Sequence, residues 1–396
     1  MPAQGYDIIT IGGGIAASAL AKAMAERGAK VLVLEREVKF KDRVRGEGMV
    51  CWGCGEAREL GIHELLKKSC GHDVPFAETG MGLRDFTSTT PQRVPLLSFL
   101  HPVMQETLLA AAERAGAEVR RGVTVEQIET GKTPAVITGG RNHERFAARL
   151  VVAADGRGSA ARKWLGFAVQ EQANPSYMAG VLLTGVKAPA DTIHFIFNPS
   201  LGMCAVLVPL GNSRFRAYLI YPKTVGYRLQ GDTMLQQFIS ESPRAYPRLA
   251  EYYAEAKSIG PLASFDASDS WVEHPYRDGV VLVGDAAATT DPTFGQGLSL
   301  ALRDARTLRD ELSKDSDWAA AASRYADRRR IYFRTCHTVE GWFRTLFQDP
   351  SPEAAAVRAK AMPLIAEDPT RVPDHINSGL DLPLNEQVRA RMFGEC

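Results

Sequence analysis

The first 35 residues alternate between short apolar runs and one glycine-rich turn. The run Tyr6 to Ile11 alternates into an apolar strand, and Gly12-Gly13-Gly14-Ile15-Ala16-Ala17 then opens a helix that ends near Arg27. A second apolar run, from Lys30 to Leu34, has the composition of a buried strand. The chain is therefore expected to begin with a strand, a helix and a second, parallel strand.

Two later stretches repeat the order of buried strand, acidic glycine turn and helix. Leu150 to Ala154 runs into Asp155-Gly156-Arg157-Gly158, and Val280 to Val283 runs into Gly284-Asp285 and a second turn that ends at Gly297. From Leu298 onward the apolar positions recur every three or four residues, which predicts a helix. Open α/β sheets bind ligands at the carboxyl ends of their strands, so both turns are expected to contact one extended ligand.

The sequence pattern predicts strands in the middle of the chain and helices towards its end. Between residues 177 and 221 we expect four mainly antiparallel strands, followed by helices at 233–240 and 248–257 that return the chain to the first lobe. The other expected elements are a helix at 101–116, short strands around Val119, Val123 and Ile137, and a long helix at 318–347. The aromatic patch on that last helix is interpreted as core or dimer contact, and the final 35 or so residues suggest no site.

Composition excludes several classes of protein but does not identify the function. The chain has 396 residues, 45% hydrophobic and 23% charged, with a net charge of +1, so no general attraction to nucleic acid or anionic membrane is expected. No secretory signal and no membrane span are seen, and six cysteines are too few for a disulfide scaffold, which favours the cytoplasm. The triplet Arg328-Arg329-Arg330 is interpreted as solvated surface.

The first glycine turn has the chemistry of a dinucleotide site. Gly12 can make the tight turn, Gly14 lets a pyrophosphate approach the backbone, and Ala17 supplies the small residue where helix meets strand. Glu35 closes the second strand, where it can accept hydrogen bonds from an adenosine ribose that carries no 2′-phosphate. The nucleotide is therefore NAD or the adenosine half of FAD. Downstream, Arg43 or Arg45 could reach its phosphates.

Together these motifs resemble the single-component flavoprotein monooxygenases of the para-hydroxybenzoate hydroxylase type. The three motifs stand in the family's order: the fingerprint from Gly12 to Glu35, Asp155-Gly156 with Ser159 and Arg162, and Gly284-Asp285 with the 292–297 turn. The resemblance covers about the first 310 residues. It implies a Rossmann-like FAD-binding domain of the glutathione-reductase type, an inserted and mainly antiparallel substrate domain, and a helical C-terminus. The implied division assigns 1–75, 101–175 and 266–315 to the FAD domain, 76–100 and 176–265 to the substrate domain, and 316–396 to the helical region.

The resemblance also implies which residues hold the cofactor. Asp155-Gly156 would serve both FAD and NAD(P)H, and the backbone of Pro292, Gly295 and Gly297 would line the reacting edge of the flavin as its catalytic part. The full set of expected cofactor residues is Gly12, Gly14, Ala17, Glu35, Arg43, Arg45, Gln105, Asp155, Gly156, Arg162, Gly284, Asp285, Pro292, Gly295, Gln296, Gly297 and Leu298. Two positions depart from the family's pattern, where Ala288 replaces a frequent histidine and His101 a frequent arginine.

The implied activity is a monooxygenase reaction. FAD, reduced by NADH or NADPH, would react with dioxygen to a flavin hydroperoxide that transfers one oxygen atom to an aromatic or other electron-rich small molecule. Phe195, Phe197, Val206, Val208 and Tyr218 could line an apolar substrate pocket. Candidates for a general base are His194, His101 and Tyr218, although each is more readily explained as a structural residue. The protein is expected to be a monomer or a homodimer.

Other functions remain open at this stage. A prenyl reductase of the same superfamily, or a flavin-binding sensor or redox partner protein, would share the nucleotide motifs. A flavin-dependent halogenase is disfavoured because the five tryptophans are far apart and form no WxWxIP signature. The pair Cys51 and Cys54 suggests a dithiol or zinc site, but no second pair stands at metal spacing and the strand context of thioredoxin is missing.

Overall fold

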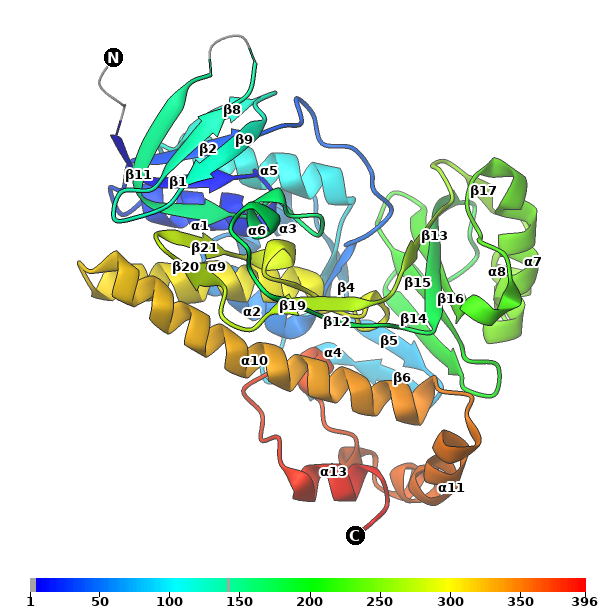
Figure 1. The fold of residues 1–396 in the computed structure, drawn as a ribbon. Helices are drawn as coiled ribbons and strands as arrows, with labels where there is room; N and C mark the ends of the chain where they lie inside the picture. The colour runs from blue at the N-terminus through cyan, green and yellow to red at the C-terminus, as the bar shows by residue number, and fades with distance from the viewer. Residues whose placement is uncertain (1–4, 141–142) are drawn as a thin grey trace.

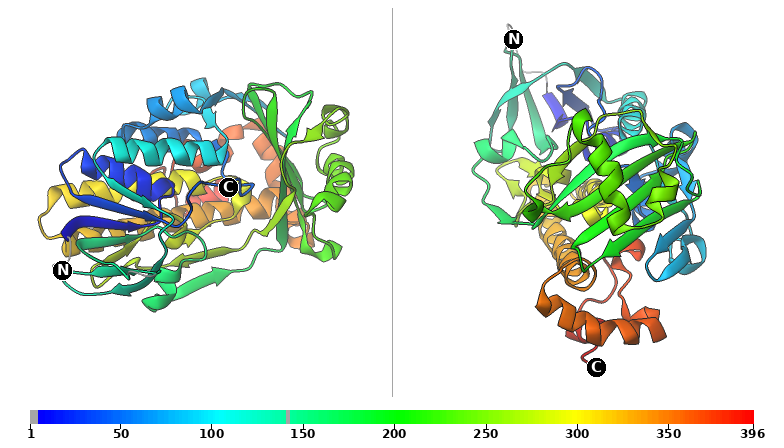
Figure 2. Two further views of the ribbon diagram at one scale, coloured as in Figure 1. Left: turned by 90° about the horizontal axis from the view of Figure 1, so that it is seen from above. Right: turned by 90° about the vertical axis from the view of Figure 1, so that its right-hand side faces the viewer.

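Two large β-sheets organise the molecule (Figure 1). The structure is a computed structural model that describes residues 5–140 and 143–396, and within them each of these sheets has eight strands. The first sheet lies among the N-terminal helices, and the second stands apart from it with its own pair of helices on the outside (Figure 2). The predicted α/β class and helical C-terminal region are confirmed.

The first sheet is mainly parallel. Its strand order is β20-β21-β11-β1-β2-β8, and β9 and β10 form an antiparallel extension on β11. The bounds are β1 Gly5–Ile11, β2 Val31–Glu35, β8 Glu118–Arg121, β9 Val125–Glu129, β10 Ala135–Thr138, β11 Arg145–Ala153, β20 Tyr276–Arg277 and β21 Val280–Leu282. Every residue of β2 is buried, because parallel strands are covered on both faces and therefore read as continuous apolar runs.

Helices cover the first sheet, and two of them begin at the edge where its parallel strands end. Three of them pack on one another along one face: α1 Ile15–Ala25, α5 His101–Arg114 and α9 Gly297–Lys314. The shorter helices of this lobe are α2 Cys51–Glu59, α3 His63–Ser69, α4 Phe86–Thr89 and α6 Ala160–Trp164. The apolar side chains of α1 and α9 join β1, β11 and β21 in one core cluster, so the glycine turns that open both helices are held at the same edge of the sheet.

The second sheet is antiparallel except where β14 meets β5. Its order is β17-β13-β16-β15-β14-β5-β6, with β18 also on β13. The bounds are β5 Phe76–Thr79, β6 Gly82–Asp85, β13 Ser176–Thr184, β14 Thr192–Asn198, β15 Met203–Pro209, β16 Arg214–Pro222, β17 Lys257–Ser258 and β18 Ala263–Asp266. One face packs under α7 Leu235–Ala245 and α8 Leu249–Tyr252, and the other faces the first lobe (Figure 2). The four strands expected between residues 177 and 221 all form.

Smaller elements connect these parts. One three-stranded sheet contains β3 Gly48–Met49, β4 His72–Val74 and β7 Leu96–Ser98. Another contains β12 Val169–Gln172, β19 Asp269–Val272 and β22 Ala288–Thr289. Short 3-10 turns are η1 Lys223–Val225, η2 Asp232–Met234, η3 Gly284–Ala286, η4 Pro292–Phe294 and η5 Pro369–Arg371. The C-terminal helices are α10 Trp318–Phe347, α11 Pro352–Glu367, α12 His375–Ser378 and α13 Glu386–Met392. None of the helices in the described residues has an apolar stretch that could span a bilayer.

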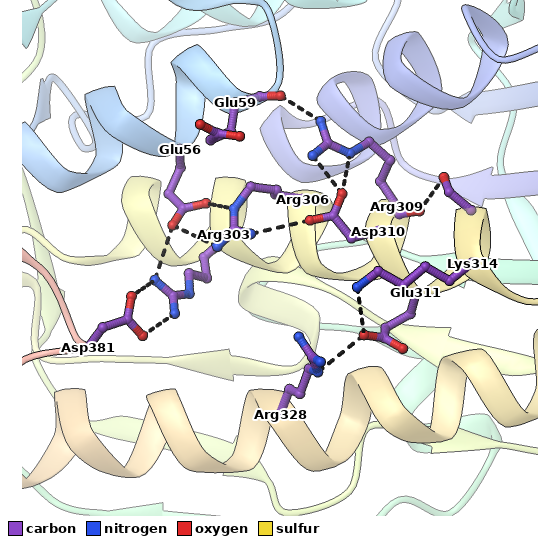
Figure 3. A network of polar contacts seen from close by, with 11 residues as sticks. Glu56, Glu59, Arg303, Arg306, Arg309, Asp310, Glu311, Lys314, Arg328 and Asp381 are labelled. Carbon is purple, nitrogen blue, oxygen red and sulfur yellow. Dashed lines mark hydrogen bonds and ion pairs between the residues drawn. The ribbon is translucent and has the colours of Figure 1, made fainter.

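Ion pairs fix α9 against two neighbouring segments (Figure 3). Glu56 on α2 receives Arg303 at 3.2 Å and also pairs with Arg306, while Arg303 reaches Asp381 in the C-terminal segment. The side chain of Glu56 is only 7% exposed, so these contacts are screened less than surface pairs. The helix that begins at Gly297 is thereby held in a fixed position beside the second glycine turn.

Three expectations are wrong in detail. The helix expected at 248–257 ends at Tyr252, because Lys257 and Ser258 pair with β13 and the chain must turn back before them. Val123 lies in a loop, where its amide donates to the carbonyl of Glu35. Arg329 is buried, only 1% exposed, although its two neighbours in the basic triplet are exposed.

Candidate functional site

A single cavity of about 1360 Å³ runs from the glycine turn after β1 to the inner face of the second sheet. Most of the expected cofactor residues line it: Gly12, Gly14, Glu35, Arg43, Arg45, Gln105, Asp155, Gly156, Gly284, Asp285, Pro292, Gly295, Gly297 and Leu298. Phe195, Phe197, Val206, Val208 and Tyr218 line it from the second sheet. Segments far apart in the sequence thus meet around one space, and the five residues that strand alternation predicted for an apolar pocket are part of its lining.

The first turn requires glycine at Gly12 and is open toward the cavity at Gly14. Gly12 has a φ of +97°, and a Cβ there would lie 2.6 Å from the carbonyl oxygen of Ala154 on the neighbouring strand. At Gly14 a Cβ would meet nothing within 4 Å, so this side of the turn is open. Gly14 is also the N-cap of α1, and no side chain caps that helix end. The turn therefore leaves room for an anionic group at a helix N-terminus, where the amides and the helix dipole favour it.

Glu35 holds the same turn from the end of β2. Its Oε2 accepts a hydrogen bond from the amide of Gly13 at 2.6 Å, and its Oε1 accepts one from the amide of Glu37 at 2.8 Å. A carboxylate offers about four acceptor sites, so two remain for further donors. Since Glu35 is 6% exposed and lines the cavity, the two remaining acceptor sites of its carboxylate are available to a ligand bound there.

Two aspartates stand at the ends of β11 and β21. Oδ2 of Asp155 accepts a hydrogen bond from the amide of Ala161 at 3.1 Å, while its Oδ1 is buried and has no partner among the described residues. Burial raises the pKa of the Asp285 carboxyl, and the positive charges of Arg45 and Arg157 oppose that rise. Both carboxylates therefore have unused capacity for hydroxyl donors in the cavity.

The turn at 292–297 is fixed from behind. Asp291 accepts hydrogen bonds from the amide of Thr293 at 2.9 Å and from Asn174 at 2.7 Å, and it pairs with Arg344 at 3.0 Å. Gly295 has a φ of +67°, a left-handed conformation that glycine adopts without strain. The backbone of this turn faces the cavity with little freedom to move.

Three residues of the expected set lie outside the cavity lining. Ala17, a residue of α1, is fully buried, and Arg162 donates to the carbonyl of Arg157 at 2.9 Å. Gln296 accepts a hydrogen bond from the indole of Trp52 at 3.0 Å and donates to the carbonyl of Phe294 at 2.6 Å. Their contacts support the turns that line the cavity.

The loop that carries the arginines is held by His101. Arg43 pairs with Glu37 at 3.0 Å, whereas Arg45 faces the cavity near Asp285. Burial lowers the pKa of His101 to about 4, so its ring is neutral near pH 7, and Nδ1 lies 2.8 Å from the carbonyl oxygen of Gly46. A neutral imidazole with Nδ1 protonated donates to that carbonyl, which fixes the loop. His101 is therefore placed to position the loop beside Arg45.

His194 and the two cysteines do not face the cavity. His194 lies on the outer side of the second sheet, next to Glu78 and the rings of Tyr246 and Tyr252. Cys51 and Cys54 are buried free thiols, and burial raises the pKa of Cys51 to about 11 and that of Cys54 to about 12. A thiol so shifted is not a nucleophile near neutral pH, which speaks against a redox role. No group of side chains suited to a metal ion occurs in the described residues.

Sequence reasoning missed the C-terminal wall of the cavity. Contrary to the expectation of no site there, seven residues of one segment line it: Pro369, Thr370, Val372, Pro373, Asp374, Ile376 and Asn377. Phe343, Leu346 and Phe347 of α10 line it too, so this patch contacts the cavity as well as the core. Asp374 binds Arg84 of β6 through two bonds of 2.7 Å, which ties the segment to the second sheet. No local pattern marks this segment, because its place depends on how it packs after α11.

Known proteins share both the sequence pattern and the fold. The family model described as FAD binding domain matches residues 5–331. The chain is 26% identical to rifampicin monooxygenase of Streptomyces venezuelae, over 88% of this chain and 73% of that protein. It is 26% identical to 6-methylpretetramide 4-monooxygenase of Streptomyces rimosus, over 93% of this chain and 91% of that protein. Other curated relatives are longer, and the chain spans between 54% and 65% of the length of several of them.

A solved structure supports the fold over nearly the whole chain. The p-nitrophenol 4-monooxygenase PnpA of Pseudomonas putida DLL-E4 superposes with a TM-score of 0.78 at 18% identity, covering 94% of this chain and 97% of that one. The family match includes the glycine turn after β1 and both acidic turns. The predicted resemblance to flavoprotein monooxygenases, and FAD as the cofactor, are thereby confirmed. The chain belongs to the FAD binding domain family.

Proposed function

We propose that this protein is an FAD-dependent monooxygenase that uses NAD(P)H and dioxygen to insert one oxygen atom into an aromatic or other electron-rich small molecule. The observation that carries this proposal is the single cavity, which joins a dinucleotide-type glycine turn to an apolar sheet face. A cofactor and a substrate held in one cavity can react without a carrier. NAD(P)H and dioxygen are the usual co-substrates of this family, and three of the proteins to which the chain is similar, rifampicin monooxygenase, 6-methylpretetramide 4-monooxygenase and PnpA, are named as monooxygenases.

The residues present fit FAD at the first lobe. The open side of Gly14 and the uncapped start of α1 would hold the pyrophosphate, and Glu35 would accept the adenosine ribose hydroxyls. The free Oδ1 of Asp155 and the carboxylate of Asp285 would bind hydroxyls of the ribityl chain, and Arg45 would face a phosphate. The backbone of Pro292, Gly295 and Gly297 would lie along the reacting edge of the ring.

The same proposal divides the chain. Residues 1–75, 101–175 and 266–315 would form a Rossmann-like FAD domain of the glutathione-reductase type, which agrees with the parallel pairing of β1, β2, β11 and β21. Residues 76–100 and 176–265 would form the mainly antiparallel substrate domain, and 316–396 would close the cavity from the third side. We further propose a cytoplasmic enzyme, monomeric or homodimeric, since all six cysteines are free.

The chain's own part in the reaction is to bind, orient and keep the site dry. Bound FAD would supply the redox chemistry and the activation of dioxygen. The uncapped N-terminus of α9, directly after the 292–297 turn, would stabilise negative charge on a reduced ring, roughly by 0.3 to 1 kcal/mol and more where water is excluded. The inner face of the second sheet, with Phe195, Phe197 and Val206, would exclude water from the substrate.

Two measurements test this function. The purified protein should show flavin absorbance, and phenolic compounds should stimulate NADH or NADPH oxidation together with oxygen uptake. Asp285→Ala should lose FAD, whereas Asp327→Ala, an exposed carboxylate on α10 whose side chain is 57% exposed, should keep it. Full FAD occupancy and activity in Asp285→Ala would refute the assignment of the site.

The alternative functions predict different outcomes. A prenyl-type reductase would oxidise NAD(P)H with an unsaturated substrate and consume no oxygen. A sensor or redox partner would bind flavin and turn over slowly with every small molecule. A sensor or redox partner does not explain why the cavity continues past the cofactor residues to a large aromatic wall. Oxygen uptake that depends on an aromatic compound would exclude both.

A further inference from the structure

Gln296, the residue just before α9, turns its side chain away from the helix that it precedes. It is the N-cap residue of α9, a position from which a polar side chain can accept hydrogen bonds from the first amides of a helix. No side chain of the described residues caps this helix. The side chain of Gln296 is fully buried and makes three hydrogen bonds elsewhere. The first amides of α9, beside the cavity-lining Gly297 and Leu298, are therefore available to a ligand.

The three hydrogen bonds of Gln296 connect the 292–297 turn to two other parts of the chain. Oε1 accepts from the indole N–H of Trp52 in α2 at 3.0 Å. Nε2 donates to the carbonyl oxygen of Phe294 at 2.6 Å and to that of Ile376 at 3.2 Å. An indole N–H can only donate and a carbonyl can only accept, so these partners fit one orientation of the amide group. The Gln296 side chain therefore has one defined position, with a partner for each of its polar atoms.

Two glycines bring α2 and the C-terminal segment close to this side chain. A Cβ on Gly53 would overlap Oγ of Ser299 and lie 2.9 Å from its Cβ, so glycine is needed for α2 to pack on the first turn of α9. Gly379 has a φ of +115°, and a Cβ there would lie 3.3 Å from Cβ of Trp52, which is itself only 3% exposed. The motif Cys51-Trp52-Gly53-Cys54, whose thiols have no role in the site, thus forms a packing surface behind the turn.

The turn is also held through an apolar side chain. Phe294 is only 2% exposed and forms one cluster with Val339 of α10 and Ile376 of the C-terminal segment. Ile376 therefore supports the turn twice, through its side chain in this cluster and through its carbonyl on Gln296. Because these contacts are buried, a shift of α2 or of the C-terminal segment would be passed to the backbone of the turn.

We propose that Trp52 and Gln296 are positioning residues, which hold the 292–297 turn and the first amides of α9 where they stabilise the reduced flavin. Neither side chain lines the cavity, so both act through the turn. The inference rests on the proposed function, because it requires the flavin ring to lie along this turn. It predicts that the midpoint potential of bound FAD depends on a hydrogen bond made outside the cavity.

The test is the midpoint potential of FAD in the loaded protein, which requires neither substrate nor turnover. It is measured by equilibrating the protein, without oxygen, with a redox dye of known potential. Gln296→Met keeps the length and approximate volume of the side chain and removes all three hydrogen bonds. The equilibrium constant for reduction of the flavin should fall about two- to fivefold, as the loss of a well-placed helix N-terminus beside an anionic ring implies. FAD should remain bound.

Gln92→Met is the matched control. Gln92 donates to the carbonyl of Ser378 at 2.9 Å, so its loss weakens the hold on the same C-terminal segment without touching the turn, and the potential should not change. Trp52→Phe keeps an aromatic ring but removes the N–H that holds Gln296, and it should lower the equilibrium constant about twofold. Since both changes break one hydrogen bond, the double variant should fall no further than Gln296→Met alone.

The outcomes separate this inference from the proposed function. An unchanged potential in Gln296→Met, an equal change in Gln92→Met, or additive effects of the changes at Trp52 and Gln296 would overturn the inference. Loss of FAD from Gln296→Met would also overturn it, because the side chain would then hold the cofactor itself. If Gln296→Met does not fold, Trp52→Phe decides, and an unchanged potential there overturns the inference. The expected shifts in a protein that takes up no oxygen with any phenol would refute the monooxygenase and leave the positioning role standing.

Discussion

The buried ion pair behind the Gly284 turn offers a sharp test of how the site is held. Asp304 of α9 is fully buried, and its Oδ2 accepts hydrogen bonds from the amide of Gly284 at 2.7 Å and from Nε of Arg329 at 3.1 Å. The hydroxyl of Tyr332 donates to its other oxygen. One carboxylate thus connects α9 and α10 to the turn that carries Asp285.

Removing one member of this pair should destabilise the protein strongly. Arg329→Met leaves Asp304 without its cation, and Asp304→Asn leaves a buried guanidinium without its anion. Breaking a buried pair in this way costs about 3 to 5 kcal/mol, a large share of the roughly 5 to 15 kcal/mol of a typical domain. In the double variant no unpaired charge remains. Its loss of unfolding free energy should therefore be smaller than the sum of the losses in the two single variants, by up to about 3 kcal/mol.

The assay is urea unfolding of the FAD-loaded protein, with Arg328→Met as the matched control. Arg328 is the adjacent arginine, its side chain is 60% exposed, and it pairs with Glu311 at 3.2 Å (Figure 3). Arg328 itself is exposed, and the buried Glu311 keeps Arg324 at 2.9 Å when Arg328 is removed, so this variant should cost at most about 1 kcal/mol. If Arg329→Met costs no more than Arg328→Met, or if the two single losses add, the buried pair does not hold the turn and the reasoning fails.

Two further predictions concern the cavity, and a third concerns a buried thiol outside it. Gly12→Ala should fold but lose most FAD affinity, because its Cβ would press on the carbonyl of Ala154, and unchanged FAD affinity in a titration would contradict the close approach. Arg84→Met should lower the free energy of unfolding by less than about 1 kcal/mol, since the pair with Asp374 is partly exposed. It should nevertheless speed FAD release in stopped flow, because the pair closes the cavity wall. Equal release rates would refute the closure. The thiol of Cys54 should react with a maleimide only in urea, and rapid labelling of the native protein would show that it is accessible.

The sequence predicted which residues of the first lobe line the cavity because the determinants of their positions are local. A tight turn at Gly12 and an open approach at Gly14 follow from backbone sterics within six residues, and the flanking apolar runs place them at a strand end. Glu35 stands at the end of the next strand, so its position follows from parallel pairing. Each of these features could be read without knowing the rest of the fold.

The basic triplet shows where a local interpretation went wrong. Arg329 was grouped with its neighbours as solvated surface, yet Tyr325, Tyr332 and Phe333 lie three or four positions away and are buried on the same helix face. The helical period placed Arg329 among them and left Arg328 outside. The pattern was present in the sequence, but the partner, Asp304 on another helix, was not visible from it.

The wall of the cavity on the side of the second sheet depends on contacts that no local pattern contains. Tyr218 donates a hydrogen bond to Glu47, 171 positions away, and Arg84 and Asp374 are 290 apart. Each pair forms only after the two lobes and the C-terminal segment have packed around the cavity. A common cofactor can be bound by backbone turns, whose sequence requirements are few and recur in order. A particular substrate is distinguished by side chains from separate segments, so its class can be argued only once those side chains are seen together.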